Sequence, residues 1–236
     1  MSETNTARAG IGETAENEVV DLCRDLIRID TSNYGDHSGP GERAAAEYIA
    51  EKLAEVGLEP KIIESHKGRA STVARIEGED PSKPALLIHG HTDVVPANAA
   101  DWTHDPFSGE IADGCVWGRG AVDMKDMDAM TLAVVRDRMR SGRKPPRDIV
   151  LAFLADEEAG GTYGARHLVD HHRDLFDGVT DAKSFDDLGI RCFGFAPLQL
   201  PPELDFAGRF HGVDERVPVD GLKFGARVLD RFIDHS

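Results

Sequence analysis

The sequence predicts an α/β fold with a mixed, mainly parallel sheet and helices on both of its faces. One observation behind this prediction is that segments with helical spacing of apolar residues alternate with short apolar runs typical of buried strands. Another is that two of these runs, from Leu86 and over 148–155, end abruptly in histidine or acidic residues. Because α/β proteins bind ligands at strand ends, the same pattern predicts where a functional site lies.

Local signals predict the individual elements, and their order favours one domain. Helices are predicted over 16–28, 127–140 and 219–233, and Pro40 begins another that runs to about Val56 and is closed by Gly57. Short runs rich in β-formers predict strands over 61–64, 72–76, 148–155 and 189–195, and a central strand from Leu86.

The central strand ends in His91 and Asp93, which are two residues apart. While the chain stays extended, their side chains share one face, so Asp93 can accept a hydrogen bond from the imidazole nitrogen that does not bind a metal. His89 lies on the same strand face and is the competing ligand. A histidine and an aspartate that merely end a strand are the alternative interpretation.

Two further clusters favour a shared site. Asp123 stands at the mouth of a glycine-permitted turn that opens the helix over 127–140, and Glu157 and Glu158 follow the strand over 148–155. Adjacent residues of an extended chain point to opposite sides, so one glutamate can bind a metal while the other faces a metal-bound water. A solvated acidic turn is the alternative for this pair alone, but three such clusters at successive strand ends make that alternative improbable.

The order of these motifs resembles that of a family of dinuclear zinc peptidases, which includes carboxypeptidase G, aminoacylase and succinyl-diaminopimelate desuccinylase. The motifs are His91-Thr-Asp93, the segment 118–125 (GRGAVDMK), Asp156-Glu157-Glu158, and His211 near the C-terminus. Both the residue types and their chain order agree with the family, continuously over about 15–178 and again over 181–234.

The resemblance implies a role for each of these residues. His91 would bind one zinc, Asp123 would bridge two, and Glu158 and His211 would bind the other. Glu157 would be the general base, with Asp93 orienting His91, and the peptide bond after Asp123 would be cis. The implied reaction is hydrolysis of a peptide or N-acyl amide bond of a small substrate by a zinc-activated water, and Co²⁺ or Mn²⁺ could replace Zn²⁺.

The chain also departs from this family near Val179. Segment 170–178 joins at once to a segment that resembles a part far beyond the family's inserted lid domain. We therefore expect a flexible N-terminus over 1–14 and a single catalytic domain over 15–236, with an internal deletion near 179–181. The lid and one acidic ligand of the His91 zinc would be missing, and Asp177 or Asp181 would be the candidates to replace that ligand. A truncated, weakly active or inactive metal-binding core is the alternative to an active enzyme. Because a deleted strand would leave an exposed sheet edge, the chain is expected either to be less stable than a full-length relative or to self-associate through that edge.

The composition of the chain limits which partners it can bind and where in the cell it is expected. The chain has 27 Lys and Arg against 43 Asp and Glu, a net charge of −16, which disfavours nucleic acid and anionic membrane surfaces. No apolar run approaches the roughly 20 residues that span a bilayer, and 1–12 is polar, so a cytoplasmic location is expected. Cys23, Cys115 and Cys192 are odd in number and widely spaced, which indicates packing residues instead of disulfides or a zinc finger.

Overall fold

The computed structural model describes residues 10–36, 38–179, 194–201, 205 and 207–236. The helices are α1 (Glu13–Arg28), α2 (Arg43–Ala54), α3 (Lys125–Ser141), α4 (His167–His171) and α5 (Val219–His235). The strands are β1 (Lys61–His66), β2 (Arg69–Ile76), β3 (Leu86–His91), β4 (Ile111–Ala112), β5 (Cys115–Trp117), β6 (Ile149–Leu154) and β7 (Arg216–Pro218). Among these residues, no helix combines the length and the apolar character that a bilayer crossing requires.

Four strands form the main sheet, in the order β1-β2-β6-β3. The sheet is mixed, as predicted, but among the described strands only β3 and β6 pair in parallel. Two isolated parallel bridges, Ser32 with Val94 and Ala85 with Val179, lie outside these strands. β1 and β2 are antiparallel because a two-residue turn joins them, and β2 also runs antiparallel to β6. The described sheet is therefore less parallel than the sequence predicts.

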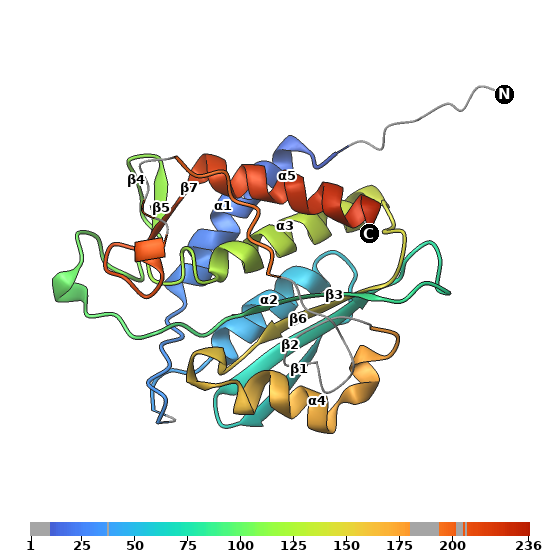
Figure 1. The fold of residues 1–236 in the computed structure, drawn as a ribbon, viewed down its shortest axis with the longest axis horizontal. Coiled ribbons are helices and arrows are strands. Elements are labelled where there is room, and N and C mark those ends of the chain that lie inside the picture. Colours follow the sequence, from blue (N-terminus) through green and yellow to red (C-terminus); the bar gives the residue numbers. More distant parts are fainter. Residues whose placement is uncertain (1–9, 37, 180–193, 202–204, 206) are drawn as a thin grey trace.

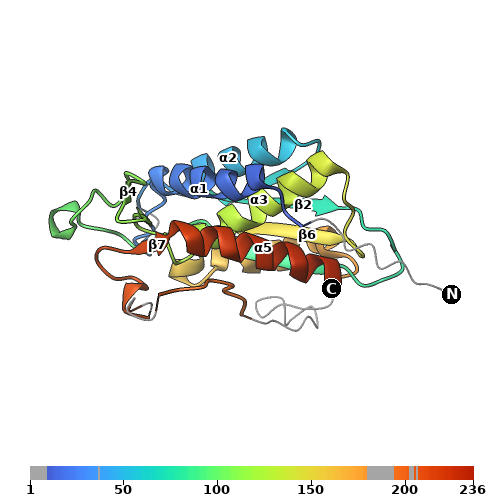
Figure 2. The ribbon, with the colours of Figure 1, turned by 90° about the horizontal axis from the view of Figure 1, so that it is seen from above.

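Helices cover both faces of the sheet, which confirms the α/β prediction. On one face α1, α3 and α5 pack together, and Figures 1 and 2 show them as one layer along the sheet. Side chains of β2 and β6 alternate between the two faces, so Ala74 and Leu151 join this larger core while Val73 and Val150 join the other. That second, smaller core lies under α4.

The helix α3 anchors the larger layer and carries part of the site at its beginning. It ends where Gly142 takes a left-handed conformation with φ of 69°, which glycine adopts without strain. Near this end the buried Arg138 pairs with Asp230 of α5, with Nε and Oδ1 2.7 Å apart. At the other end the fully buried ammonium of Lys125 donates to the carbonyls of Leu26 (3.0 Å) and Ile29 (2.8 Å) at the end of α1.

Three short strands form a second sheet beside the larger layer. Its order is β4-β5-β7, and Trp117 of β5 is opposite Arg216 of β7. This register brings Glu215 beside Gly118, whose N–H donates to the Glu215 carbonyl at 3.0 Å. The small sheet thereby joins the C-terminal part of the chain to the turn that precedes α3.

The helix predictions over 16–28, 127–140 and 219–233 are confirmed with small shifts at their ends, and the second predicted helix corresponds to α2. The predicted strands up to residue 155 are confirmed as β1, β2, β3 and β6. Of the strand predicted over 189–195, residues 189–193 lie outside the described residues, and 194–195 form no regular element.

Candidate active site

Four of the side chains predicted as ligands meet at the ends of β3 and β6. His91 Nε2 lies 3.1 Å from Asp123 Oδ1, and His211 Nε2 lies 3.2 Å from Asp123 Oδ2 and 3.1 Å from Glu158 Oε2. Ligand atoms of His91, Asp123 and Glu158 lie within 4.8 Å of one another, a spacing that could hold a metal ion. His89 is not part of this group.

The hydrogen bonds of His91 differ from the sequence prediction. Its Nδ1 lies 3.0 Å from the backbone carbonyl oxygen of Asp93, whereas the nearest Asp93 carboxylate oxygen is 3.6 Å away, beyond hydrogen-bond distance. The expectation that this carboxylate accepts from the imidazole is therefore wrong for the side chain. The backbone of Asp93, and not its side chain, makes the contact with His91.

The Asp93 carboxylate instead holds the turn that carries both glutamates. This fully buried side chain accepts hydrogen bonds from the N–H of Glu157 and of Glu158, both at 3.0 Å, and from Nδ2 of Asn33 at 2.9 Å. One carboxylate thus links the end of β3, the end of β6 and the segment after α1. Asn33 was not predicted from the sequence.

The two glutamates lie in a helical turn and not in an extended segment. Asp156 has a left-handed φ of 65°, and Glu157–Ala159 form a 3₁₀ turn. The prediction that an extended chain separates the two side chains is therefore wrong, although the two still meet different environments. The Glu158 side chain is 5% exposed and reaches His211, whereas that of Glu157 is 59% exposed, with Oε2 3.8 Å from His91 Nε2.

Asp123 lies in a tightly held turn before α3, and its peptide bond to Met124 is cis, as the resemblance implies. Gly120 has a φ of 87°, and a Cβ there would lie 2.9 Å from a methyl group of Val94, so glycine is required by both strain and space. The Glu215 carboxylate accepts from the N–H of Val122 (2.7 Å) and of Asp123 (3.2 Å).

Arg119 and Glu215 form a buried ion pair beside this turn, with Nη1 and Oε2 2.6 Å apart. Sequence reasoning missed both residues. They are 96 positions apart, so no spacing rule links them, and only the pairing of β5 with β7 brings them together. An arginine between two glycines in an otherwise apolar turn was the available signal, because a buried guanidinium requires an anionic partner.

Charge is concentrated at this end of the sheet. Burial raises the pKa of Glu158 to about 7, although His91 and His211 act in the opposite direction. For His91, burial opposes protonation, but the hydrogen bond to Asp123 and the nearby negative charges of Asp123 and Asp93 outweigh burial and hold its pKa well above the usual value. One carboxylate oxygen of Glu158, Oε1, is buried without a hydrogen-bond partner. A buried excess of carboxylate with an unsatisfied oxygen is the environment that a divalent cation fits.

The structure argues against Asp177 as the replacement ligand. Asp177 precedes the Val179 bridge to Ala85, which lies at the start of β3, whereas His91 ends that strand. Its carbonyl accepts a hydrogen bond from Arg75. Asp181, the other candidate, lies outside the described residues.

Polar side chains gathered at strand ends define the class of this protein, an α/β domain with its site at one edge of the sheet. Residues 87–183 match the group described as Peptidase family M20/M25/M40, and the chain belongs to this family. Over 157 residues it is 37% identical to aminoacylase-1 of Sus scrofa, covering 66% of this chain and 38% of that protein. Over 138 residues it is 47% identical to a probable carboxypeptidase S-like 2 of Dictyostelium discoideum, covering 56% and 24%.

Solved structures show the same fold. Human carnosine dipeptidase 1 aligns with a TM-score of 0.58 at 23% identity, over 71% of this chain and 38% of that one. The di-peptidase Dug1p from Saccharomyces cerevisiae aligns with a TM-score of 0.55 at 25% identity, over 71% and 40%. The chain thus spans well under half the length of these relatives.

Proposed function

We propose that this chain is the catalytic core of a metal-dependent hydrolase that cleaves a peptide or N-acyl amide bond of a small substrate. The observation that carries the proposal is the convergence of His91, Asp123, Glu158 and His211 at the strand ends. Two imidazoles and two carboxylates form a donor set that suits zinc, and Co²⁺ or Mn²⁺ could take its place.

The four residues would hold metal unequally. Asp123, Glu158 and His211 would provide three protein ligands to one cation, whereas His91 and Asp123 would provide only two to a second. Bound cations of this kind polarise a substrate carbonyl and lower the pKa of a water. We therefore expect metal analysis to find one tightly bound zinc and a second, weaker one. Two equally tight zincs per chain would contradict this asymmetry.

Glu157 would act as the general base. Its carboxylate is largely exposed, and its Oε2 lies 3.8 Å from His91 Nε2, so it faces the space where a substrate would reach the ligand group. In this role Glu157 removes a proton from the attacking water and then gives a proton to the leaving amine. Asp93 would act as a positioning residue, because its carboxylate fixes the backbone of both glutamates.

The substrate class follows from the relatives. Aminoacylase-1, carnosine dipeptidase 1 and carboxypeptidase S-like 2 are named for acylated amino acids, a dipeptide and peptide carboxyl ends, respectively. We propose a dipeptide or an N-acyl amino acid for this chain. Neither a nucleic acid nor a membrane is part of the proposal.

The decisive test compares the parent protein with Glu157→Gln and Glu158→Gln in zinc. The parent should hydrolyse N-acetyl amino acids or dipeptides. Glu157→Gln should lose about a hundredfold or more of that activity while keeping its zinc, the range for loss of a general base. Glu158→Gln should lose zinc. Retained zinc in Glu158→Gln together with lost zinc in Glu157→Gln would reverse the two roles.

The alternative is a metal-binding core with little turnover, and the junction near Val179 motivates it. If the domain lacks a lid and a strand, an unprotected edge of the sheet would favour self-association. Light scattering on the purified chain would then show dimers or larger species. A monodisperse monomer with brisk dipeptide hydrolysis would contradict this alternative and favour a self-sufficient enzyme.

A further inference from the structure

The Glu215 carboxylate makes an unusually complete set of hydrogen bonds. Its Oε1 accepts from the N–H of Val122 and Asp123, and its Oε2 accepts from the N–H of Gly120 (3.2 Å) and from Arg119 Nη1. Neither partner of the ion pair is exposed to a significant degree, since Glu215 is 0% and Arg119 4% exposed. Every donor comes from the single turn that presents Asp123.

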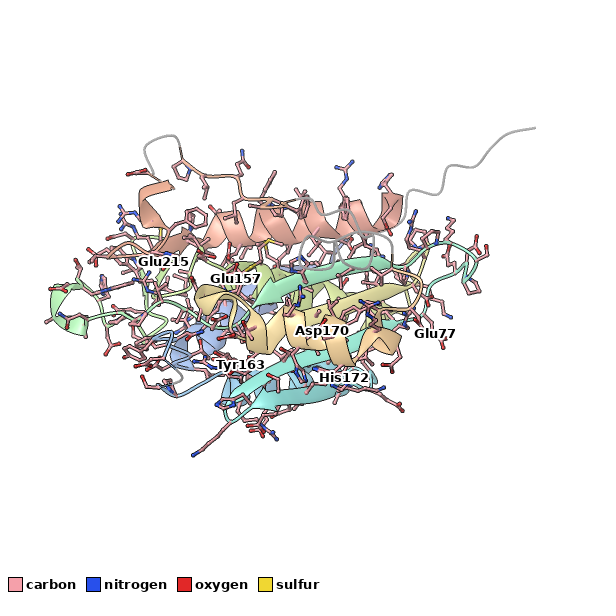
Figure 3. The ribbon with its side chains drawn as sticks, turned by 60° about the horizontal axis from the view of Figure 1, so that its bottom comes forward. Glu77, Glu157, Tyr163, Asp170, His172 and Glu215 are labelled. Carbon is pink, nitrogen blue, oxygen red and sulfur yellow. The ribbon has the colours of Figure 1, made fainter. Side chains whose placement is uncertain are left out.

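Arg119 extends this network to the other side of the site. Its Nη2 donates to the backbone carbonyl of His211 at 3.4 Å, and its guanidinium carbon lies 5.2 Å from the centre of the Trp102 ring. His211 itself has a left-handed φ of 57°, a conformation that needs support from its surroundings. In Figure 3, Glu215 and Glu157 lie toward the same end of the molecule and Glu77 toward the opposite end.

We propose that Glu215 and Arg119 are a positioning pair that sets Asp123 and His211 in place together. Glu215 fixes the backbone of the Asp123 turn, and Arg119 connects that turn to the backbone of His211. Neither residue touches the substrate or the cation. The inference rests on the proposed metal centre and adds to it the pair that pre-assembles half of the ligands.

Replacing Glu215 with Gln tests the acceptor role at nearly constant volume. Each carboxylate oxygen serves two donors, whereas an amide offers one oxygen and one NH₂ group. In either orientation the NH₂ group faces two donors and leaves them unsatisfied, so the Asp123 turn must shift. We expect the zinc dissociation constant to rise by about 10–100-fold, the range for loss of a residue that orients a metal ligand.

Two charge-conserving variants separate positioning from simple electrostatics. Glu215→Asp keeps the charge but shortens the side chain, and Arg119→Lys keeps the charge but loses the planar fork that bonds Glu215 and His211 at once. Both should weaken zinc binding, and the Co²⁺-loaded protein should show a changed visible absorption spectrum, which reports ligand geometry. Arg138→Lys, in the buried pair with Asp230, is the matched control, expected to lower the melting temperature without altering zinc affinity or the Co²⁺ spectrum.

Zinc affinity, the Co²⁺ spectrum and thermal melting of the full chain decide the matter. Folded Glu215→Gln or Arg119→Lys protein with parental zinc affinity and spectrum would overturn the inference, and Arg119→Lys decides alone if Glu215→Gln does not fold. An Arg138→Lys control that weakens zinc binding equally would overturn it too, because the effect would then be general destabilisation. A parent that binds zinc without hydrolysing any substrate would refute only the proposed function, whereas a parent that binds no zinc would refute both.

Discussion

Asp93 and Glu215 are two buried carboxylates that each hold a different turn of the candidate site. Asp93 accepts hydrogen bonds from the backbone of the turn that carries Glu157 and Glu158, and Glu215 accepts from the backbone of the turn that carries Asp123. Their side-chain donors differ. Asp93 also accepts a hydrogen bond from the neutral amide of Asn33, whereas Glu215 also accepts one from the guanidinium of Arg119.

The pKa values of the two carboxylates are shifted in opposite directions. Burial alone would raise the pKa of Asp93, but His91 and the hydrogen-bond donors outweigh burial and hold the pKa below its usual value. For Glu215, burial dominates despite Arg119, and its pKa is raised. The comparison teaches that a buried carboxylate can hold a turn by accepting backbone hydrogen bonds whether its surroundings favour its ionised form, as for Asp93, or disfavour it, as for Glu215.

Asp93→Asn is the strongest test of this equivalence. The amide turns one acceptor into a donor that faces a backbone N–H, so unsatisfied buried groups should cost about 3 kcal/mol of unfolding free energy. Displacement of Glu158 should weaken zinc binding about 100-fold. Denaturant titration and zinc competition measure both effects. Asp80→Asn, in an exposed turn where the carboxylate also accepts a backbone N–H, is the control with little effect. An Asp93→Asn protein with parental zinc affinity would show that the two carboxylates are not equivalent.

The pH dependence of the zinc-free protein should reflect the raised pKa of Glu158. Its folded value of about 7 exceeds its unfolded value, so its contribution is fully present below about pH 4.5 and is lost as the pH rises through 7. Unfolding free energy should fall on the order of 2 kcal/mol over that window. The lowered pKa of Asp93 has the opposite effect on stability. The contribution of Asp93 to the unfolding free energy is lost only as the pH falls below the usual aspartate pKa near 3.8. Glu158→Gln should flatten the curve between pH 5 and 7, and an unchanged slope would contradict the assignment.

Asn33→Ala should have a smaller effect. The variant removes the Nδ2 donor to Asp93 and the Oδ1 acceptor of Arg69, but it leaves both backbone hydrogen bonds of Asp93 intact. A loss of about 1–2 kcal/mol in unfolding free energy is expected, since buried polar partners are left unpaired. Asn98→Ala, at an exposed short helix, is the matched control. Equal melting temperatures for the two variants would show that the amide does not support Asp93.

A double variant of Asp93→Asn and Glu215→Gln gives the finest comparison. The two carboxylates share no hydrogen-bond donor, so their effects on unfolding free energy should add to within about 0.5 kcal/mol. Their effects on zinc affinity should not add, because a cation that has lost ligands on one side has less to lose on the other. A coupling of about 1 kcal/mol in zinc binding is expected from the cycle. Strict additivity in both measurements would indicate that the two turns do not support one metal centre.

The same comparison explains what the sequence could predict. Asp93 was found because it stands two residues from His91 at the end of an apolar run, a relation that local geometry determines. The contact it makes was predicted wrongly, because the Asp93 carboxylate accepts from the N–H groups of Glu157 and Glu158, and the backbone carbonyl of Asp93 meets the imidazole instead. The helical turn of Glu157 and Glu158 was missed for a similar reason, since it depends on hydrogen bonds to that distant carboxylate.

Residues joined only by tertiary structure were beyond local reasoning. Glu215 and Asn33 carry no motif, and their roles depend on the pairing of β5 with β7 and on the path of the chain after α1. The helices and most strands were predictable because their apolar spacing is local. The antiparallel partners of β2 were not, since apolar alternation fixes which face is buried but not which strand is adjacent.

The spread of the site along the chain has a consequence for biosynthesis. His91, Asp123 and Glu158 leave the ribosome well before His211 and Glu215, and the pairing of β5 with β7 cannot form until Arg216–Pro218 are available. A nascent chain halted before this point would contain most of the buried sheet. It would lack both the imidazole of His211 and the Glu215 carboxylate that holds the Asp123 turn. On the proposed function, tight capture of a cation would therefore wait until residues 211–218 have been synthesised, and metal loading would report that β7 has paired with β5.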